Sequence, residues 1–335
     1  HRDISTVGRL DWRNYALALR SYFRLIRVCR QERPNLVYVP ISQTRIGFLR
    51  DSGYLLLARL FGKSQTAIHL HGGYFGRFYE ACGPLMRWFI DRIMGRVDSA
   101  IVLADCFRPI FRRLLPEDAI HVVPNGTELS IPGLQVKLEQ SNSKAIFMVT
   151  YLSSLLMEKG IADFAMAARL CATTRQDLLF QAAGEWQSNS RELQSEIVAL
   201  SQQLPPGTFR MLGRVDGSSK AALLGETDIF VLPTFYPFEG QPTVILEAMA
   251  AGCAIVASQH ASIPEIIQDG VNGLLVPPRN PEKLAETILH LAENPSLCRR
   301  LGREAHRTYR DRFTTVASND ALGRAFEAIL AARAR

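Results

Sequence analysis

The chain has 335 residues, which is too long for one ordinary doubly wound domain and suits two. Hydrophobic residues make up 47% and charged residues 21%, as in an ordinary globular protein. No apolar run reaches the roughly 18 residues of a transmembrane helix, which excludes such a helix from this sequence. The six cysteines form no C-x-x-C pair, so a disulfide framework and a zinc site are excluded, and we expect reduced core thiols in a cytoplasmic protein.

The net charge of +7 is concentrated in the first part of the chain. Residues 1–140 carry 20 Lys and Arg against 12 Asp and Glu, whereas the remaining residues carry 19 against 20. This excess predicts an anionic partner for the first part: a membrane surface, an anionic acceptor or nucleic acid. Nucleic acid is the least favoured of the three, because neither a recognition-helix motif nor a set of stacking aromatic residues accompanies the charge.

The first predicted element is an amphipathic helix over residues 10–31, whose apolar face includes Leu19 and Phe23 and whose arginines lie largely opposite. For its basic face we favour contact with solvent over contact with a membrane. Short apolar strands then alternate with helices, which predicts a parallel sheet covered by helices. The strands are predicted at 36–39, 66–70, 99–103 and 121–123, and the helices at 54–61, 85–93 and 107–115.

A doubly wound domain normally opens with a strand and a Gly-rich turn. This chain begins at His1 with polar residues and a helix, so we expect the first domain to be truncated and to lack its opening strand. Residues 128–144 show no hydrophobic pattern and are interpreted as a linker. The strand-and-helix alternation resumes at residue 145. We therefore predict an N-terminal domain over 1–140, a C-terminal domain over 141–315 and a final helix within 316–335.

The stretch from Asp228 to Ser258 is the most informative part of the chain. It predicts a buried strand over 229–232, a loop closed by Glu239-Gly240-Gln241, and a helix over 243–251. Pro242 stands where the first helical position should be, and its missing N–H costs nothing there. Glu247 is the one charge inside this otherwise apolar helix, and a buried carboxylate needs partners. The free N–H groups of a first helical turn bind anions, phosphate above all. Amides for phosphate and two carboxylates for hydroxyl groups together predict a nucleotide sugar as ligand.

The pair Glu239-x7-Glu247, followed by Ala-Met-Ala-Ala-Gly, resembles the signature of retaining glycosyltransferases of family 4. Further motifs of that family occur in the same order. They are Val123-Pro124-Asn125-Gly126, Glu158-Lys159-Gly160, Gly184-Glu185, Leu212-Gly213, Ile263-Pro264-Glu265 and Asp269-Gly270-x-Asn272-Gly273-Leu274-Leu275-Val276. The resemblance covers about residues 99–313 and is strongest over 209–280.

The resemblance implies a fold class, α/β of the GT-B type, in which two doubly wound Rossmann-like domains face a cleft. It implies that the first domain binds the acceptor, that the second binds the nucleotide sugar, and that the final helix crosses back toward the first. It implies no metal and no cofactor, since the nucleotide-diphosphate sugar is itself the donor substrate.

The resemblance also assigns roles to residues. His71, Glu239 and Lys159 match catalytic positions: His71 and Glu239 near the transferred sugar, and Lys159 on the diphosphate. Glu247 matches the residue that holds the ribose hydroxyls, and Leu212-Gly213 the edge that binds the base. The donor-binding set is Ser154, Lys159, Gly184, Leu212, Gly213, Glu239, Gly240, Gln241, Thr243, Val244 and Glu247.

Two histidines and one asparagine have structural alternatives. His71 ends a predicted strand, where a histidine is often structural, although we favour a functional role. We expect His69 to face the opposite way and to be structural. Asn125, before Gly126, is equally consistent with a turn and with a functional role.

The sequence departs from the family at one point. Ser153 and Ser154 occupy positions where the family often has Gly-Arg, and a hydroxyl group cannot neutralise charge as a guanidinium does. Lys159 and the helix start at Thr243 are then expected to carry the diphosphate, with an arginine of the first domain as a further candidate.

These features predict a retaining glycosyltransferase that acts on a glycan or lipid-linked acceptor in surface polysaccharide synthesis. We expect it in the cytoplasm, with peripheral contact to the anionic inner membrane surface as a further hypothesis. The alternatives are a nucleotide-sugar epimerase or hydrolase on the same fold, and a non-catalytic nucleotide-sugar-binding protein. No nucleic-acid partner is expected.

Overall fold

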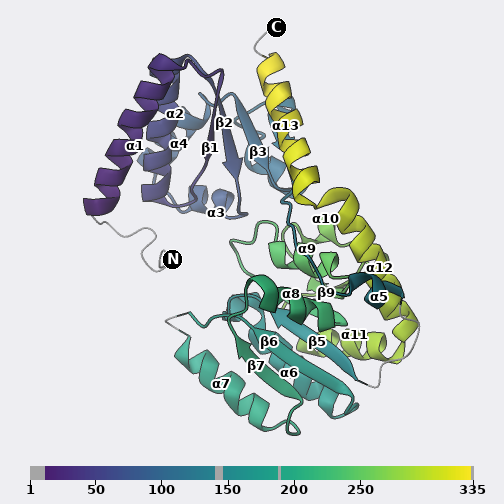
Figure 1. Cartoon of the computed structure of the whole chain (residues 1–335). Helices are drawn as coiled ribbons and strands as arrows, with labels where there is room; N and C mark the ends of the chain where they lie inside the picture. The colour runs from purple at the N-terminus through teal and green to yellow at the C-terminus, as the bar shows by residue number, and fades with distance from the viewer. Residues whose placement is uncertain (1–11, 140–145, 188–189, 333–335) are drawn as a thin grey trace. The chain divides into compact units, whose positions relative to one another are not determined.

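The computed structural model of the chain describes residues 12–139, 146–187 and 190–332 (Figure 1). The chain forms two compact units, one of residues 1–124 with 319–335 and one of residues 125–318. The expected truncated start and the expected domain boundary at 140/141 lie outside the described residues. Within those residues, no helix combines the length and the apolar character needed to cross a membrane.

In its described part, the first unit contains a four-stranded parallel sheet in the order β1-β2-β3-β4. Its elements are α1 (Trp12–Gln31), β1 (Leu36–Pro40), α2 (Arg45–Gly62), β2 (Gln65–Leu70), α3 (Phe75–Glu80), α4 (Pro84–Met94), β3 (Ser99–Val102), the 3-10 helices η2 (Asp105–Ile110) and η3 (Glu117–Ala119), and β4 (Ile120–Val122). The helix predicted over 107–115 is wrong. That segment forms the short 3-10 helix η2 and turns, because Pro109 lacks the N–H that an α-helix needs.

Helix α1 packs on α2, but not through the apolar face predicted for it. Tyr22 lies over Gly53, where a Cβ atom would be 2.6 Å from the tyrosine oxygen, and Cys29 is close to Gly62. Leu19 and Phe23 remain 56% and 71% exposed. The outer side of α1 therefore presents apolar side chains to solvent beside its arginines.

The second unit contains a parallel sheet that has six strands in the described residues, in the order β10-β9-β8-β5-β6-β7. Its elements are α5 (Leu134–Glu139), β5 (Phe147–Leu152), η4 (Met157–Lys159), α6 (Ile161–Ala172), β6 (Leu178–Ala183), α7 (Arg191–Gln202), β7 (Phe209–Gly213), α8 (Gly217–Glu226), β8 (Ile229–Leu232), α9 (Thr243–Ala250), β9 (Ala254–Ser258), α10 (Ile263–Ile266), β10 (Leu274–Val276), α11 (Pro281–Glu293) and α12 (Pro295–Arg312). The chain builds outward from β5 to β7 and then returns to place β8 on the other side of β5. This doubly wound order has a switch point between β5 and β8.

The central strands of the second unit are buried along their whole length. β8 and β9 have no exposed residue, because helices cover both faces of the sheet. Helix α9 is also buried from Ile245 to Ala250, as its apolar sequence predicts. Gly252 follows it at φ 65°, a conformation that favours glycine after a helix.

The segment interpreted as a linker contains helix α5, which has only six residues and is therefore too short to show a hydrophobic period. Lys137 of α5 donates hydrogen bonds to the carbonyl oxygen of Leu224 at 3.1 Å and to that of Ala251 at 2.8 Å. These carbonyl groups lie at the carboxyl ends of α8 and α9, where a cation is favourable. Residues 134–139 thus belong structurally to the second unit.

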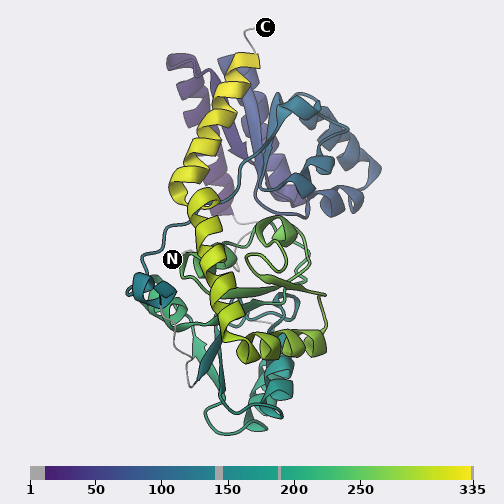
Figure 2. The same ribbon diagram turned by 90° about the vertical axis from the view of Figure 1, so that its right-hand side faces the viewer.

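The last helix, α13 (Thr315–Ala332), begins in the second unit and continues into the first. Figure 2 shows α13 in yellow in front of the sheet of the first unit. Ala325 and Ile329 are buried in a cluster with residues of β2, β3 and the end of β4, namely Ala67, Ile101 and Val123. Residues 319–332 therefore contribute to the core of the first unit.

Candidate functional site

The switch point of the second sheet brings two loops together. β5 pairs with β8, with Val149 opposite Ile229, so the chains leaving their carboxyl ends emerge side by side. One of these loops contains Lys159 and the other contains Glu239. In open α/β sheets, ligands bind outside the carboxyl ends of the strands at this point.

Lys159 and Glu239, both predicted catalytic residues, are in direct contact. The Lys159 Nζ donates to Oε2 of Glu239 at 2.8 Å. The Thr234 hydroxyl donates to the same carboxylate oxygen at 2.9 Å, and Glu239 is only 6% exposed. The Lys159 ammonium also lies 4.5 Å from the centroid of the Tyr236 ring, a favourable cation–π distance. A buried carboxylate is thus paired with an ammonium group and a hydroxyl group at the switch point.

Other side chains fix the loop that carries Glu239. The Ser258 hydroxyl donates to the Thr234 carbonyl oxygen. The His260 Nε2 lies 2.9 Å from the Tyr236 carbonyl oxygen, as a donor to it. Burial, followed by the charge of Glu239, raises the pKa of Tyr236 and keeps its hydroxyl protonated at neutral pH. The loop is therefore ordered by its own contacts.

Asn125 and Ser262 hold the Gly240-Gln241 segment. The Asn125 backbone N–H donates to Oε1 of Gln241 at 2.5 Å, and its side-chain amide donates to the Gln241 carbonyl oxygen at 3.1 Å. The Ser262 hydroxyl donates to the Gly240 carbonyl oxygen at 2.6 Å. In this structure Asn125 supports the loop after Glu239, which gives it a positioning contact that neither sequence alternative described.

Glu247 lies on α9 and is 9% exposed. Its Oε1 accepts a hydrogen bond from Lys220 Nζ at 2.5 Å. Its Oε2 is buried and has no hydrogen-bond partner among the described residues. An unsatisfied buried acceptor costs about 1–3 kcal/mol, so this oxygen favours a ligand that brings a hydroxyl donor.

Lys220 was missed by the sequence reasoning. It lies on α8, which was not predicted, although Asp216 and Ser219 form a capping box that marks the start of this helix. Its pairing with Glu247 joins residues 27 positions apart and is visible only in three dimensions. Ser154 stands where the family often has an arginine. In the described residues, Lys159 and Lys220 are the cations that contact the predicted donor-site carboxylates.

The start of α9 is open. Pro242 is the N-cap residue with φ −70° and ψ 109°, and the helix begins at Thr243, as predicted. Pro242 therefore lies one position before the first helical position expected for it. No side chain caps the first-turn N–H groups, and Thr243 is exposed while Val244 is half-buried. The Ile245 N–H donates to the Pro242 carbonyl oxygen at 3.1 Å, so the N–H groups of Thr243 and Val244 are the ones of this turn that an anion could use.

The ends of β6 and β7 meet the loop after β5. The Gly184 N–H donates to the Gly213 carbonyl oxygen at 2.8 Å. A Cβ atom on Gly184 would lie 1.8 Å from the Ser153 carbonyl oxygen, so only glycine fits there. Ser154 and Leu212 are exposed at this edge. Ser154, Gly184, Leu212 and Gly213 therefore lie at or just after the carboxyl ends of β5, β6 and β7.

His71 belongs to the first unit, at the carboxyl end of β2. Its ring lies against that of His69, with 3.9 Å between the ring centroids. The expectation that His69 faces the opposite way is wrong, because residues two apart on a strand share a face. His71 as a residue is exposed, yet its ring loses water against His69, and this burial lowers its pKa.

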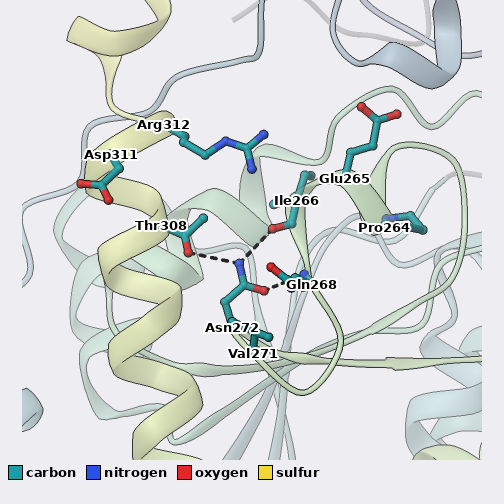
Figure 3. A pocket seen from close by; sticks show the side chains of 9 residues that line it. All are labelled: Pro264, Glu265, Ile266, Gln268, Val271, Asn272, Thr308, Asp311 and Arg312. Atoms are coloured by element: carbon teal, nitrogen blue, oxygen red, sulfur yellow. Dashed lines mark hydrogen bonds between the residues drawn. The ribbon is translucent and has the colours of Figure 1, made fainter.

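A separate cavity of about 460 Å³ lies between α12 and the loop after α10 (Figure 3). Asn272 spans its floor, where its amide donates to the Ile266 carbonyl oxygen at 3.1 Å and to the Thr308 hydroxyl at 3.2 Å. The residues that line it include none of the predicted site residues, so it is distinct from the switch-point site.

Comparison with known proteins identifies the family. The profile of the family described as "Glycosyl transferases group 1" matches residues 136–308, and that of the "Glycosyl transferase 4-like domain" matches residues 2–126. The chain is a member of the group 1 glycosyltransferase family.

Two mycobacterial relatives illustrate the similarity. Alpha-maltose-1-phosphate synthase of Mycolicibacterium smegmatis is 27% identical over 231 residues, which is 64% of this chain and 59% of that protein. Phosphatidyl-myo-inositol mannosyltransferase of Mycobacterium leprae is 28% identical over 234 residues, 68% of this chain and 58% of that protein. The chain thus spans less than two thirds of the length of these relatives.

Solved structures of glycosyltransferases share the fold. HepE of Anabaena in complex with UDP has a TM-score of 0.75 at 19% identity and covers 92% of this chain and 82% of its own. Sucrose-phosphate synthase of Thermosynechococcus elongatus has a TM-score of 0.69 at 16% identity and covers 95% and 78%. The group 1 glycosyltransferase described here therefore has the GT-B fold, with two Rossmann-like domains, as the sequence predicted.

Proposed function

We propose that this protein transfers a sugar, with retention of anomeric configuration, from a nucleotide-diphosphate sugar to a glycan or lipid-linked acceptor. The observation that carries the proposal is the pairing of Lys159 with Glu239 at the switch point, at 2.8 Å. In the same unit, Glu247 leaves one buried oxygen without a partner. Together they offer a cation for a diphosphate and an acceptor for ribose hydroxyl groups.

The reaction follows from these groups. The acceptor oxygen forms a bond to the anomeric carbon while the bond from that carbon to the phosphate oxygen breaks. Attack on the face from which the diphosphate leaves gives retention, and the departing phosphate takes the acceptor proton. Lys159 and the first-turn amides of α9 stabilise the charge on the leaving group, so the step requires no metal ion or cofactor.

The comparisons support a donor class and a pathway class. HepE was solved with UDP, which favours a UDP-sugar as donor here. The amylovoran biosynthesis glycosyltransferase AmsK of Erwinia amylovora is 40% identical over 74 residues, 21% of this chain, which favours a role in surface polysaccharide synthesis. We assign donor binding to the second unit and acceptor binding to the first.

The test uses the whole protein. A thermal-shift screen against UDP-, GDP- and ADP-sugars should show one preferred donor, and NMR of the product should show the donor's anomeric configuration. An inverted product would refute the retaining mechanism. Free sugar or an isomer from donor alone would indicate a hydrolase or an epimerase, and binding without turnover a non-catalytic protein.

A peripheral contact with the inner, cytoplasmic membrane face is a second part of the proposal. Phe23 is 71% exposed on α1, and Arg20, Arg24 and Arg27 are exposed on the same helix. Exposed apolar groups beside arginines suit an anionic lipid surface. Sedimentation with vesicles containing phosphatidylglycerol, but not with pure phosphatidylcholine, is expected. Phe23→Ser should weaken this binding, and equal sedimentation with both vesicle types would refute it.

A further inference from the structure

We propose that the C-terminal helix α13 positions the imidazole of His71, acting through an aromatic stack in the first unit. The stack consists of Phe326 on α13, Tyr38 on β1 and His69 on β2. The inference rests on the proposed function in one respect, since it takes His71 as a catalytic residue. His69, Tyr38 and Phe326 act on His71 and are positioning residues.

Each member of the stack contacts the next. The Phe326 ring meets the Tyr38 ring edge to face, with 5.5 Å between centroids. The Tyr38 hydroxyl lies 2.5 Å from Nδ1 of His69, a hydrogen bond that sets the rotation of the imidazole. The His69 ring then lies 3.9 Å from that of His71, at an interplanar angle of 33°. The chain of contacts runs from α13 to the end of β2 without a gap.

The sheet explains why these residues meet. Tyr38 pairs with Ala67 across β1 and β2, and His69 and His71 follow Ala67 at two-residue steps, so all four occupy one face. This is the face that α13 covers, since Ala325 and Ile329 are buried against Ala67. Phe326, next to Ala325, is therefore held against Tyr38 by the packing of this part of α13.

His69 is suited to support and unsuited to proton transfer. It is 5% exposed, and its Nε2 has no partner among the described residues. Burial, with a smaller contribution from His71, lowers the pKa of His69 to about 3, so this ring stays neutral at physiological pH. Other ionisable groups lie on the same side of the sheet. His121 is on β4, two strands away, and borders a cavity with Arg324 of α13.

The contact with His69 restricts the orientation of the His71 ring, and burial favours the neutral form of that ring. An exposed histidine at a strand end samples several rotamers, whereas a reacting group must be held close to its working geometry. Stacking on His69 restricts that freedom and excludes water from one face of the ring. A neutral imidazole can then accept a hydrogen bond from the sugar or donate one to it.

The test combines steady-state kinetics with NMR titration of the histidine side chains in the full-length protein. Tyr38→Phe keeps the ring and removes the hydroxyl. It is expected to lower kcat about 2- to 10-fold, the effect of one neutral hydrogen bond, with little change in the KM for the donor. His69→Ala should move the pKa of His71 up toward its ordinary value, and His69→Phe should restore most of the shift. His121→Gln is the matched control and should change neither quantity.

The outcomes separate this inference from the proposed function. If His69→Ala and Phe326→Leu fold normally but leave both kcat and the pKa of His71 unchanged, the inference is wrong. If His71→Ala keeps full transfer activity, His71 is not catalytic and that part of the proposed function fails. The NMR titration of His71 reports on the stack in either case, because it does not depend on turnover.

Discussion

Replacement of Glu247 by glutamine tests the proposed assignment of the nucleotide's ribose to this residue. The substitution keeps the size of the side chain and removes its charge. In the structure Oε1 of Glu247 is engaged by Lys220, and Oε2 is buried without a partner. The free oxygen is therefore the one that a ribose hydroxyl would use.

The size of the effect follows from that single oxygen. A hydrogen bond to an ionised group contributes about 1.5–3 kcal/mol, and glutamine can place its amide nitrogen, a donor, at the same position. Loss of this bond is expected to raise the Kd of the nucleotide about 10- to 150-fold, at about 1.4 kcal/mol for each tenfold change. Lys220→Gln should weaken binding as well, because Oε1 then loses the cation that orients it. The double variant should bind no more weakly than Glu247→Gln alone.

Isothermal titration calorimetry with UDP, GDP and ADP provides the measurement, and the preferred nucleotide is used for the variants. Glu226→Gln is the matched control, because Glu226 is exposed at the far end of α8. It should bind the nucleotide as the unmodified protein does. A Kd within twofold of the unmodified value for Glu247→Gln, with the same Tm, would refute the assignment of Glu247 to the ribose.

Three further predictions concern other parts of the chain. Lys159→Ala should lower kcat by at least about 100-fold while circular dichroism shows both units folded, since it removes the cation from the leaving group; near-normal turnover would exclude that role. Asn125→Ala removes a side-chain hydrogen bond to the Gln241 carbonyl oxygen. It should increase proteolytic cleavage within 234–241 and raise the donor KM a few fold. An unchanged cleavage rate would contradict a loop-positioning role. The pKa of His69 is about 3 in the folded chain and about 6.5 when unfolded, so the unfolded chain binds the extra proton and stability falls on acidification. Between pH 7.5 and pH 5 the protein should lose about 2 kcal/mol more unfolding free energy than His69→Leu, measured by urea titration; parallel pH profiles would refute this.

The two-domain α/β fold was predictable because parallel strands leave a strong sequence signal. Buried strands such as Ile229–Leu232 appear as short apolar runs, and the helices between them follow from the need for crossover connections. Shorter elements left no such signal. Helix α5 spans fewer than two turns. The segment that contains Pro109 forms a 3-10 helix where an α-helix was predicted.

The candidate site could be predicted from the sequence only as a set of motif positions. Glu239 and Glu247 are close in sequence, and their spacing could be read directly. Lys220 was not, because its contact with Glu247 depends on how α8 packs beside α9. The prediction for His69 placed its side chain on the wrong face of the strand. Residues two apart on a strand share a face, which places His69 beside His71.

The bonds from Lys137 to the ends of α8 and α9 have a consequence for the divergence of this family. One ammonium group ties the far ends of the helices that carry Lys220 and Glu247, so their spacing is set away from any ligand. Under the proposed function, a substitution in the loop over 234–238 would change the surroundings of the sugar and leave the spacing of these two helices unchanged. A change of sugar with the same nucleotide would then require no change in α8 or α9.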